Sequence, residues 1–588
     1  MGVDDSGQLA SVRYQPDEKP LPAIAFGLGL QFAILIIARI VVIPMVVVRA
    51  GGGTEAYLSW ALFAAVSICG LTTILQAFRF GRIGAGYVAV MGTSLAVVAV
   101  SITAVAEGGP ALLATLVVVA SLVPLALSAR LSLFRRLLTP TVSGTVIMLI
   151  PATLMPTVFG LLEDVPVGTS TLAAPLSALV TVLIIVGIAL RTTGGLRLWA
   201  PVIGVALGSL AAGWVGLFNV DGIAEAAWVG LPAGEWPGLA LDFGPIFWAL
   251  LPAFVLVALI ESVQTISNAV AVQRVSWRQL RAVDFRAVQG AVTAAGIGNL
   301  LSGLAGTVPN TLLSTGVAVV ELTGAAARRI GVAVGIVFVA VAFLPKALAV
   351  VLAIPGPVVA AYLAVLQATL FVVGMKVIVQ DGIDYRKGLV VGLSFWVGVG
   401  FQNGAIFPEF AQAFAGGLLR NGVTAGGLMA ILMTFFMEMT KPRRGRMETR
   451  FDLSALPKIR EFLVAFASRG GWDGTMAERL EAVGEETLLT LLGQDEAGEE
   501  KEQRRLLLMA RKEGDRAVLE FVAATGEDNL QDRIALLGDQ MGEIPIERDV
   551  SLRLLRHLAS SVRHEQYHDT DIVTVRVDAP EKIPGGHA

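Results

Sequence analysis

The segment LSGLAGTVPNTLLSTGVAVVELTG, from Leu301 to Gly324, is apolar, yet glycine and proline interrupt its first half. Its heptad STGVAVV (Ser314–Val320) resembles GTSLAVV (Gly92–Val98), about half of the membrane region away, and the GRIGAGYVAVMG stretch that leads into that heptad is also rich in glycine. Paired broken segments at corresponding places in two halves of a chain are typical of transporters built from inverted repeats. We therefore expect each segment to form a short extended piece and then a half-helix. The free N–H groups and positive dipole end of each half-helix would lie near the middle of the bilayer.

Hydropathy places these segments in a membrane protein. The chain has 588 residues, of which 55% are hydrophobic and 15% charged, and its mean hydropathy is +0.72. This average is too high for a soluble protein of that size. Apolar runs of the length that crosses a bilayer predict an all-α polytopic membrane protein with fourteen spans, arranged as two inverted repeats of seven with short strands in spans three and ten. The predicted spans are residues 24–48, 57–78, 86–104, 108–128, 139–161, 173–190, 198–217, 245–271, 287–305, 310–323, 329–353, 356–379, 387–402 and 421–439.

The charges in the loops predict the orientation. Arginine and lysine gather in alternate loops, and the longest of the other loops, residues 218–244, has neither. By the positive-inside rule both termini are cytoplasmic, and we expect the chain to lie in the lipid bilayer of the inner membrane. Residues 1–22 are then a cytoplasmic tail, 23–440 the membrane domain and 441–588 a cytoplasmic soluble α+β domain. The net charge of −3 points to no nucleic-acid partner.

A polar stripe interrupts the eighth predicted span. The stretch LIESVQTISNAV carries Glu261, Gln264, Thr265 and Asn268 at helical positions i, i+3, i+4 and i+7, so that they share one face. An ionisable group inside a membrane span indicates a functional site, because burying it without a partner costs several kcal/mol.

These segments together resemble the nucleobase–ascorbate transporters, which include bacterial uracil and xanthine permeases. The resemblance covers about Tyr14 to Lys441 and rests on YQPDEKPLPAIAFGLGLQFAIL, ALIESVQTISNAV and the Leu301–Gly324 segment. It implies a core domain (spans 1–4 and 8–11) that slides against a gate domain (spans 5–7 and 12–14), usually in a homodimer.

The resemblance also implies a binding site for a nucleobase. In that family the glutamate of span eight accepts hydrogen bonds from the N–H groups of the base, and the short strands supply backbone groups to its edge. A carboxylate offers only acceptors, which suits adjacent N–H donors of a xanthine or a pyrimidinedione. The substrate-binding positions carried over to this chain are Glu261, Thr265, Thr93, Ser94, Leu95, Phe32, Ser314, Thr315 and Gly316.

The chain departs from the family pattern at three places. Phe32 stands where bacterial members commonly have a histidine, and Thr265 stands where they have a charged side chain. The family signature begins with a carboxamide, a carboxylate or proline and then asparagine, but here the two positions are Thr315 and Gly316. The four histidines all lie in the C-terminal region, so histidine cannot relay protons in the membrane, and H⁺ or Na⁺ coupling stays open.

Arg39 is an addition, inside the first predicted span. An arginine in hydrocarbon costs at least ~2.5–3.5 kcal/mol on insertion scales, so it needs a partner or water. Three alternatives follow: it snorkels to an interface, it forms a salt bridge with Glu261 or Glu321, or it contacts the substrate directly.

The region after Met447 predicts an α+β fold. MAERLEAVGEETLLTLL is amphipathic, RRLLLMARKEGDRAVLEFVAA reads as strand–turn–strand, DVSLRLLRHLASSVRHEQ as a helix and DIVTVRVD as a strand. This order resembles the ATPase-like domain of anti-sigma-factor kinases, but the nucleotide motifs are not intact: Thr490 follows the Glu485–Glu486 pair where asparagine is needed, and AATGEDN lacks the aspartate. A cluster of His564, Glu565, His568 and Asp569 suggests either metal binding or, as we favour, a solvated turn.

The predicted function is secondary-active, elevator-type transport of a nucleobase such as uracil, xanthine or urate. The alternatives are an anion transporter of the same general fold, which Arg39 and the half-helix N-termini favour, and a transporter-derived sensor that signals to a cytoplasmic protein through the C-terminal domain. We expect no enzymatic activity, no cofactor and no resident metal.

Overall fold

The computed structural model describes residues 12–579 apart from 132–138, 164, 166–168, 193–194, 218–222, 225, 233, 280, 381, 410–421, 440–444, 493–504, 514, 524–552 and 569. The chain forms two compact units. One comprises Met1–Leu280 and Ala287–Met439, and the other comprises Arg281–Arg286 and Thr440–Ala588.

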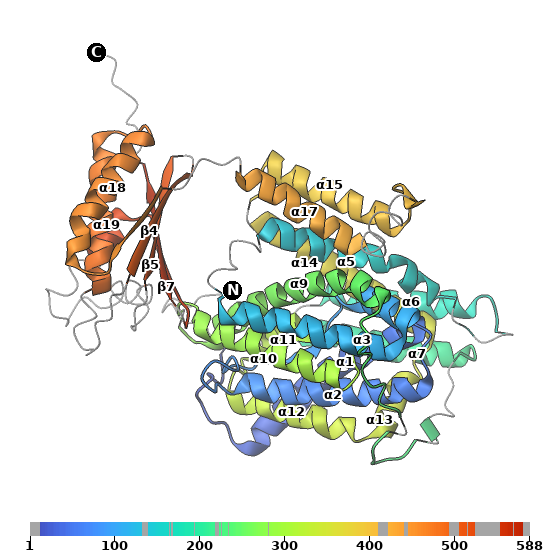
Figure 1. Cartoon of the computed structure of the whole chain (residues 1–588). Coiled ribbons are helices and arrows are strands. Elements are labelled where there is room, and N and C mark those ends of the chain that lie inside the picture. Colours follow the sequence, from blue (N-terminus) through green and yellow to red (C-terminus); the bar gives the residue numbers. More distant parts are fainter. Residues whose placement is uncertain are drawn as a thin grey trace. The chain divides into compact units, whose positions relative to one another are not determined.

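The first unit contains two groups of helices that pack mainly within themselves (Figure 1). The first group consists of α1 (Pro22–Ala50), α2 (Glu55–Ala77), α3 (Val98–Ala129), α9 (Pro245–Ser276), α10 (Phe285–Leu304), α11 (Ser314–Thr323), α12 (Arg328–Ala342) and α13 (Pro345–Leu352). The second group consists of α5 (Pro140–Gly160), α6 (Ala173–Arg191), α7 (Gly195–Trp214), α14 (Gly356–Gln380), α15 (Tyr385–Gln402) and α17 (Gly422–Met439). Contacts of α9 with α5 and α17, and of α1 with α7, join the two groups.

Glycines allow the helices to approach closely within each group. A Cβ atom at Gly70 of α2 would lie 2.7 Å from the carbonyl oxygen of Gly335 on α12. In the second group, a Cβ atom at Gly374 of α14 would lie 2.8 Å from the carbonyl oxygen of Gly144 on α5. Small residues at such contacts are typical of helix packing in membranes.

The predicted spans correspond to helices, but their number stays a prediction. Each of the fourteen segments overlaps a helix of the structure. Among the described residues seven helices are long and apolar enough to cross a membrane, or eight if the bent pair α12 and α13 is one span. The span predicted over 329–353 is not one straight helix, because the chain bends by 83° between α12 and α13. Pro345 begins α13 and disfavours helical backbone at Leu344.

The predicted strands of spans three and ten are present and pair with each other. Strand β1 (Met91–Thr93) runs antiparallel to β2 (Asn310–Leu312), with Gly92 opposite Thr311. Helix α3 follows β1 and α11 follows β2. Within α3, Gly109 has φ 77° and breaks the helix, so that a half-helix follows β1 before the next helical segment begins.

The C-terminal unit contains an antiparallel sheet with two helices on one face (Figure 1). The strand order is β3 (Gly445–Arg450), β4 (Arg505–Glu513), β5 (Arg516–Ala523), β7 (Asp571–Asp578) and β6 (Ser561–Gln566). The turn η1 (Leu453–Ala455) leads into α18 (Leu456–Arg469), and α19 (Gly474–Leu492) follows. Apolar side chains of both helices and of β4, β5 and β7 form one core.

Predictions for this unit are confirmed in part. The amphipathic helix is α19, the strand–turn–strand is β4 and β5, and the last strand is β7. A single helix over 549–566 is wrong, since helix occupies only 553–558 of the described residues there and β6 follows. The sequence of β6 is also compatible with a helix, and its pairing with β7 makes it a strand.

The residues that the sequence offered as nucleotide or metal ligands in this unit make contacts within the unit itself. Thr490 donates to the carbonyl oxygen of Glu486 at 2.6 Å, and Glu485 pairs with Arg460 at 3.6 Å. The idea of a solvated turn is wrong for His564, which is buried on β6. Asp569 and the AATGEDN segment beyond Ala523 lie outside the described residues, among which no cluster of three or more metal-ligating side chains occurs. The ATPase-like fold stays a prediction.

Candidate functional site

The paired strands β1 and β2 form the centre of the first group of helices. Two further backbone bonds extend the pairing, from Ser94 N to Pro309 O at 3.2 Å and from Leu313 N to Val90 O at 3.0 Å. Helix α2 fixes β1, because the Thr73 hydroxyl accepts from Met91 N at 3.0 Å. Every residue of both strands is buried, so the strands fix where the two half-helices begin.

The polar stripe of α9 lies along these strands. The Asn268 side chain donates to the carbonyl oxygen of Leu312 at 2.7 Å, and the hydroxyls of Thr265 and Thr311 lie 3.3 Å apart. These contacts place Glu261, about one turn before Thr265, near the end of β1.

Glu261 retains an unused acceptor at this place. The residue is 4% exposed, and its carboxylate interacts with the Ser94 side chain. Its Oε1 atom is buried and has no hydrogen-bond partner among the described residues. A buried carboxylate oxygen without a donor is costly, so a ligand that brings an N–H group would bind here favourably.

Arg39 lies beside the same strands, on α1. The hydroxyl of Thr93 donates to the carbonyl oxygen of Arg39 at 3.0 Å, and Nη1 of Arg39 donates to the hydroxyl of Thr315 at 3.4 Å. Its Nε atom is buried without an acceptor in the described part of the chain. The side chain also interacts electrostatically with Tyr362 of α14, which belongs to the second group of helices.

This position bears on the three alternatives for Arg39. No ion pair within 4.0 Å joins it to Glu261 or Glu321 among the described residues, and Glu321 is exposed. The contact with Thr315 keeps the guanidinium at the first turn of α11, which differs from an arginine that extends along a helix to an interface. Contact with the substrate, the third alternative, stays a prediction.

The other predicted site residues lie around the paired strands β1 and β2 and differ in their exposure. Thr93, Ser94 and Leu95 are buried at the end of β1. Gly316 packs against Val90, since a Cβ atom there would lie 3.0 Å from the Val90 Cβ. Ser314 is exposed, whereas Phe32 is fully buried, so Phe32 presents no surface to a ligand in this conformation.

A cavity of about 660 Å³ lies along the N-terminal part of α1, before Arg39. Its lining comes from the N-terminal segment, from α1 and α11 of the first group and from α7 of the second: Arg13, Tyr14, Ile24, Leu28, Gln31, Leu35, Trp199, Val319, Leu322 and Thr323. Arg39 lies one turn beyond Leu35, and Thr315 lies one turn before Val319. The Arg39–Thr315 bond is therefore placed just past the inner end of the cavity.

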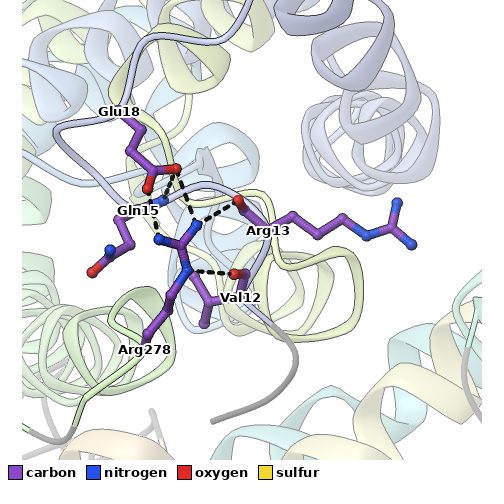
Figure 2. Close-up of polar contacts among 5 residues, drawn as sticks. All are labelled: Val12, Arg13, Gln15, Glu18 and Arg278. Atoms are coloured by element: carbon purple, nitrogen blue, oxygen red, sulfur yellow. Dashed lines mark hydrogen bonds and ion pairs between the residues drawn. The ribbon is translucent and has the colours of Figure 1, made fainter. Parts of the chain in front are cut away.

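The N-terminal segment that reaches this cavity is held by Arg278 (Figure 2). The Arg278 guanidinium donates to the carbonyl oxygens of Val12 at 3.1 Å and Arg13 at 2.9 Å, and it pairs with Glu18 at 2.8 Å. Partial burial alone would raise the pKa of Glu18, but the hydrogen bonds and charge of Arg278, with the backbone N–H of Gln15, outweigh it and lower that pKa. The described part of the predicted tail is thus fastened to the membrane unit.

Sequence reasoning missed several contributors to this site. Tyr362 is a single tyrosine in an apolar helix, and only tertiary packing brings it near Arg39. Asn310 is 1% exposed, its N–H donates to the Asn299 side chain at 2.7 Å, and its own carboxamide has no partner among the described residues. The PNT triplet at 309–311, polar residues in an apolar segment, was the available signal.

Comparison with known proteins defines the class of protein that carries this site. The profile of the Permease family (Xan_ur_permease) matches residues 24–405, which include both strands, α1 and α9. The chain belongs to this family of permeases, and its C-terminal unit lies beyond the matched region.

Two of the relatives of this chain are permeases. Xanthine permease XanP of Escherichia coli K12 is 28% identical over 447 residues, covering 72% of this chain and 94% of XanP. Uric acid permease PucK of Bacillus subtilis is 26% identical over 439 residues, covering 72% of this chain and 97% of PucK. Among solved structures, the transmembrane domain of the cyanobacterial bicarbonate transporter BicA aligns with a TM-score of 0.45 and 16% identity, covering 72% of this chain and 99% of that domain.

Proposed function

We propose that this permease is a secondary-active transporter of a nucleobase, and that its substrate is an oxidised purine of the xanthine or urate type. The observation that carries the proposal is the unused Oε1 acceptor of Glu261, which is buried beside Ser94, next to the paired strands β1 and β2. A flat purine with adjacent N–H donors matches this carboxylate. The names of the relatives XanP and PucK support the same substrate class.

The two groups of helices support an elevator-type movement. Glu261, Arg39, Thr93 and Thr315 all belong to the first group, which we propose to be the core domain that carries the substrate. Tyr362 and the α7 wall of the cavity belong to the second group, the proposed gate domain. Sliding of one group against the other would expose the site to each side in turn, in a chain with fourteen spans, cytoplasmic termini and a homodimeric assembly. The coupling ion, if one is used, would be H⁺ or Na⁺.

A small inorganic anion is the second candidate substrate, and Arg39 at the first turn of α11 favours it. The carboxylate of Glu261 opposes it, because a small inorganic anion brings no N–H edge to offset the repulsion between its charge and the carboxylate.

Calorimetric titration of the purified full-length protein separates the two candidates. Xanthine, urate and uracil are titrated in parallel with bicarbonate and sulfate. The proposal predicts saturable binding of xanthine or urate and none of the inorganic anions. Binding of an inorganic anion alone would replace it with the second candidate.

A further inference from the structure

The guanidinium of Arg39 is a partly buried cation whose charge no described side chain neutralises. It donates one hydrogen bond to a neutral hydroxyl, that of Thr315, and its buried Nε has no acceptor. Neither Glu261 nor Glu321 forms an ion pair with it in the described part of the chain, and the titratable group that interacts with it is Tyr362, a neutral phenol at ordinary pH. A cation held in this way inside a membrane protein calls for an anionic partner.

Glu261 presents the opposite case, beside the residue that follows the same strand. Thr93, at the end of β1, donates to the Arg39 backbone, and the next residue, Ser94, interacts with the Glu261 carboxylate. The Arg39 backbone therefore lies beside the end of β1, with its guanidinium at the first turn of α11, and the Glu261 carboxylate lies beside the residue that follows β1. Each side chain has unused hydrogen-bonding capacity. A neutral base would use the acceptor and leave the cation uncompensated.

We propose that Arg39 selects the anionic form of the substrate. This inference rests on the proposed purine function and makes it more specific: the ligand is a purine that has lost a proton, such as the urate monoanion. Its N–H edge binds Glu261 and its negatively charged edge binds Arg39.

The cavity next to Arg39 is large enough for a ligand of that size. The cavity of about 660 Å³ ends one helical turn from the Arg39–Thr315 bond, and its volume lies in the range of pockets that hold small organic ligands. Arg39 itself is half-buried, so its side chain remains accessible to a ligand that binds beside the paired strands.

A pair of probes that differ in charge tests the inference. Binding of urate, which is an anion at neutral pH, is compared with binding of hypoxanthine, which is neutral, in the full-length protein. Loss of a charge-assisted hydrogen bond in Arg39→Gln should weaken urate binding about tenfold or more and change hypoxanthine binding by less than about threefold. Arg39→Lys keeps the charge and should retain part of the preference for urate.

A matched control comes from the same helix. Arg49 lies near the other end of α1 and pairs with Glu55 at 3.3 Å, so Arg49→Gln removes an equal charge away from the strands and should leave both affinities unchanged. Retained hypoxanthine binding shows that Arg39→Gln is folded.

The outcomes separate this inference from the proposed function. If the wild type binds both purines and Arg39→Gln leaves their affinity ratio unchanged, the inference is rejected and the purine function stands. Equal loss of both purines in a variant that elutes like the wild type also counts against charge selection. If the wild type binds neither purine, the proposed function fails and the inference fails with it.

Discussion

Replacing Glu261 with glutamine separates binding from stability. The substitution keeps the shape of the side chain, removes its charge and turns one acceptor into a donor. A hydrogen bond to a charged group contributes roughly 1.5–3 kcal/mol, so purine affinity should fall about tenfold or more. The ligand-free protein should be as stable as the wild type or more stable, because Oε1 has no donor in the described structure and an unpaired buried charge is costly.

Two assays and one control decide this prediction. Calorimetry measures the affinity for xanthine or urate, and thermal denaturation without ligand measures stability. Glu321→Gln makes the same chemical change at an exposed position of α11 and should affect neither. Unchanged purine affinity in Glu261→Gln would refute the reasoning, and so would a fall in affinity that merely follows a loss of stability.

Three further predictions concern the support of the site. Asn268→Ala removes the donor to a buried carbonyl of β2 and should destabilise the protein by about 1–3 kcal/mol, measured by chemical denaturation, and weaken purine binding. Gly298→Ala places a Cβ atom 2.9 Å from the Asn310 side chain and should lower both the melting temperature and the affinity. Because the folded pKa of Glu18 is lowered, docking of residues 12–20 is stabilised above the ordinary glutamate pKa and weakens as the pH falls through the lowered value. Hydrogen exchange of this segment should show that dependence, and Arg278→Gln should weaken it.

Each of these changes has a comparison in the same chain. Ser267→Ala alters an exposed neighbour of Asn268 on α9 and should cost little. A Cβ atom at Gly392 meets nothing within 4 Å, so Gly392→Ala should be neutral or stabilising. If Ser267→Ala or Gly392→Ala costs as much as its counterpart, the contacts around β2 do not explain the loss. Equal protection of residues 12–20 at all pH values would contradict the role of Glu18.

The two short strands were predictable because the sequence pattern that indicates them is local. Glycine and proline within an apolar segment, repeated in the other half of the chain, led to β1 and β2, and their pairing was observed. The polar stripe of α9 was predictable from the helical spacing of its residues, and Asn268 and Thr265 do lie along β2.

Contacts that depend on tertiary packing could not be predicted. Arg278 binds backbone carbonyl oxygens of Val12 and Arg13, which have no sequence signature. The sequence left three alternatives for Arg39, since the position of its guanidinium depends on where α11 begins relative to α1. The proximity of Tyr362 to Arg39 comes from contact between the two groups of helices.

The central claim is that a purine binds where β1 meets β2, between Glu261 and Arg39. A structure of the full-length protein determined with xanthine or urate by electron cryomicroscopy tests it most directly. The account predicts a flat ligand beside the paired strands β1 and β2, with its N–H edge at hydrogen-bond distance from Glu261 Oε1. A ligand bound away from both strands, or one whose N–H edge faces away from Glu261, would contradict it.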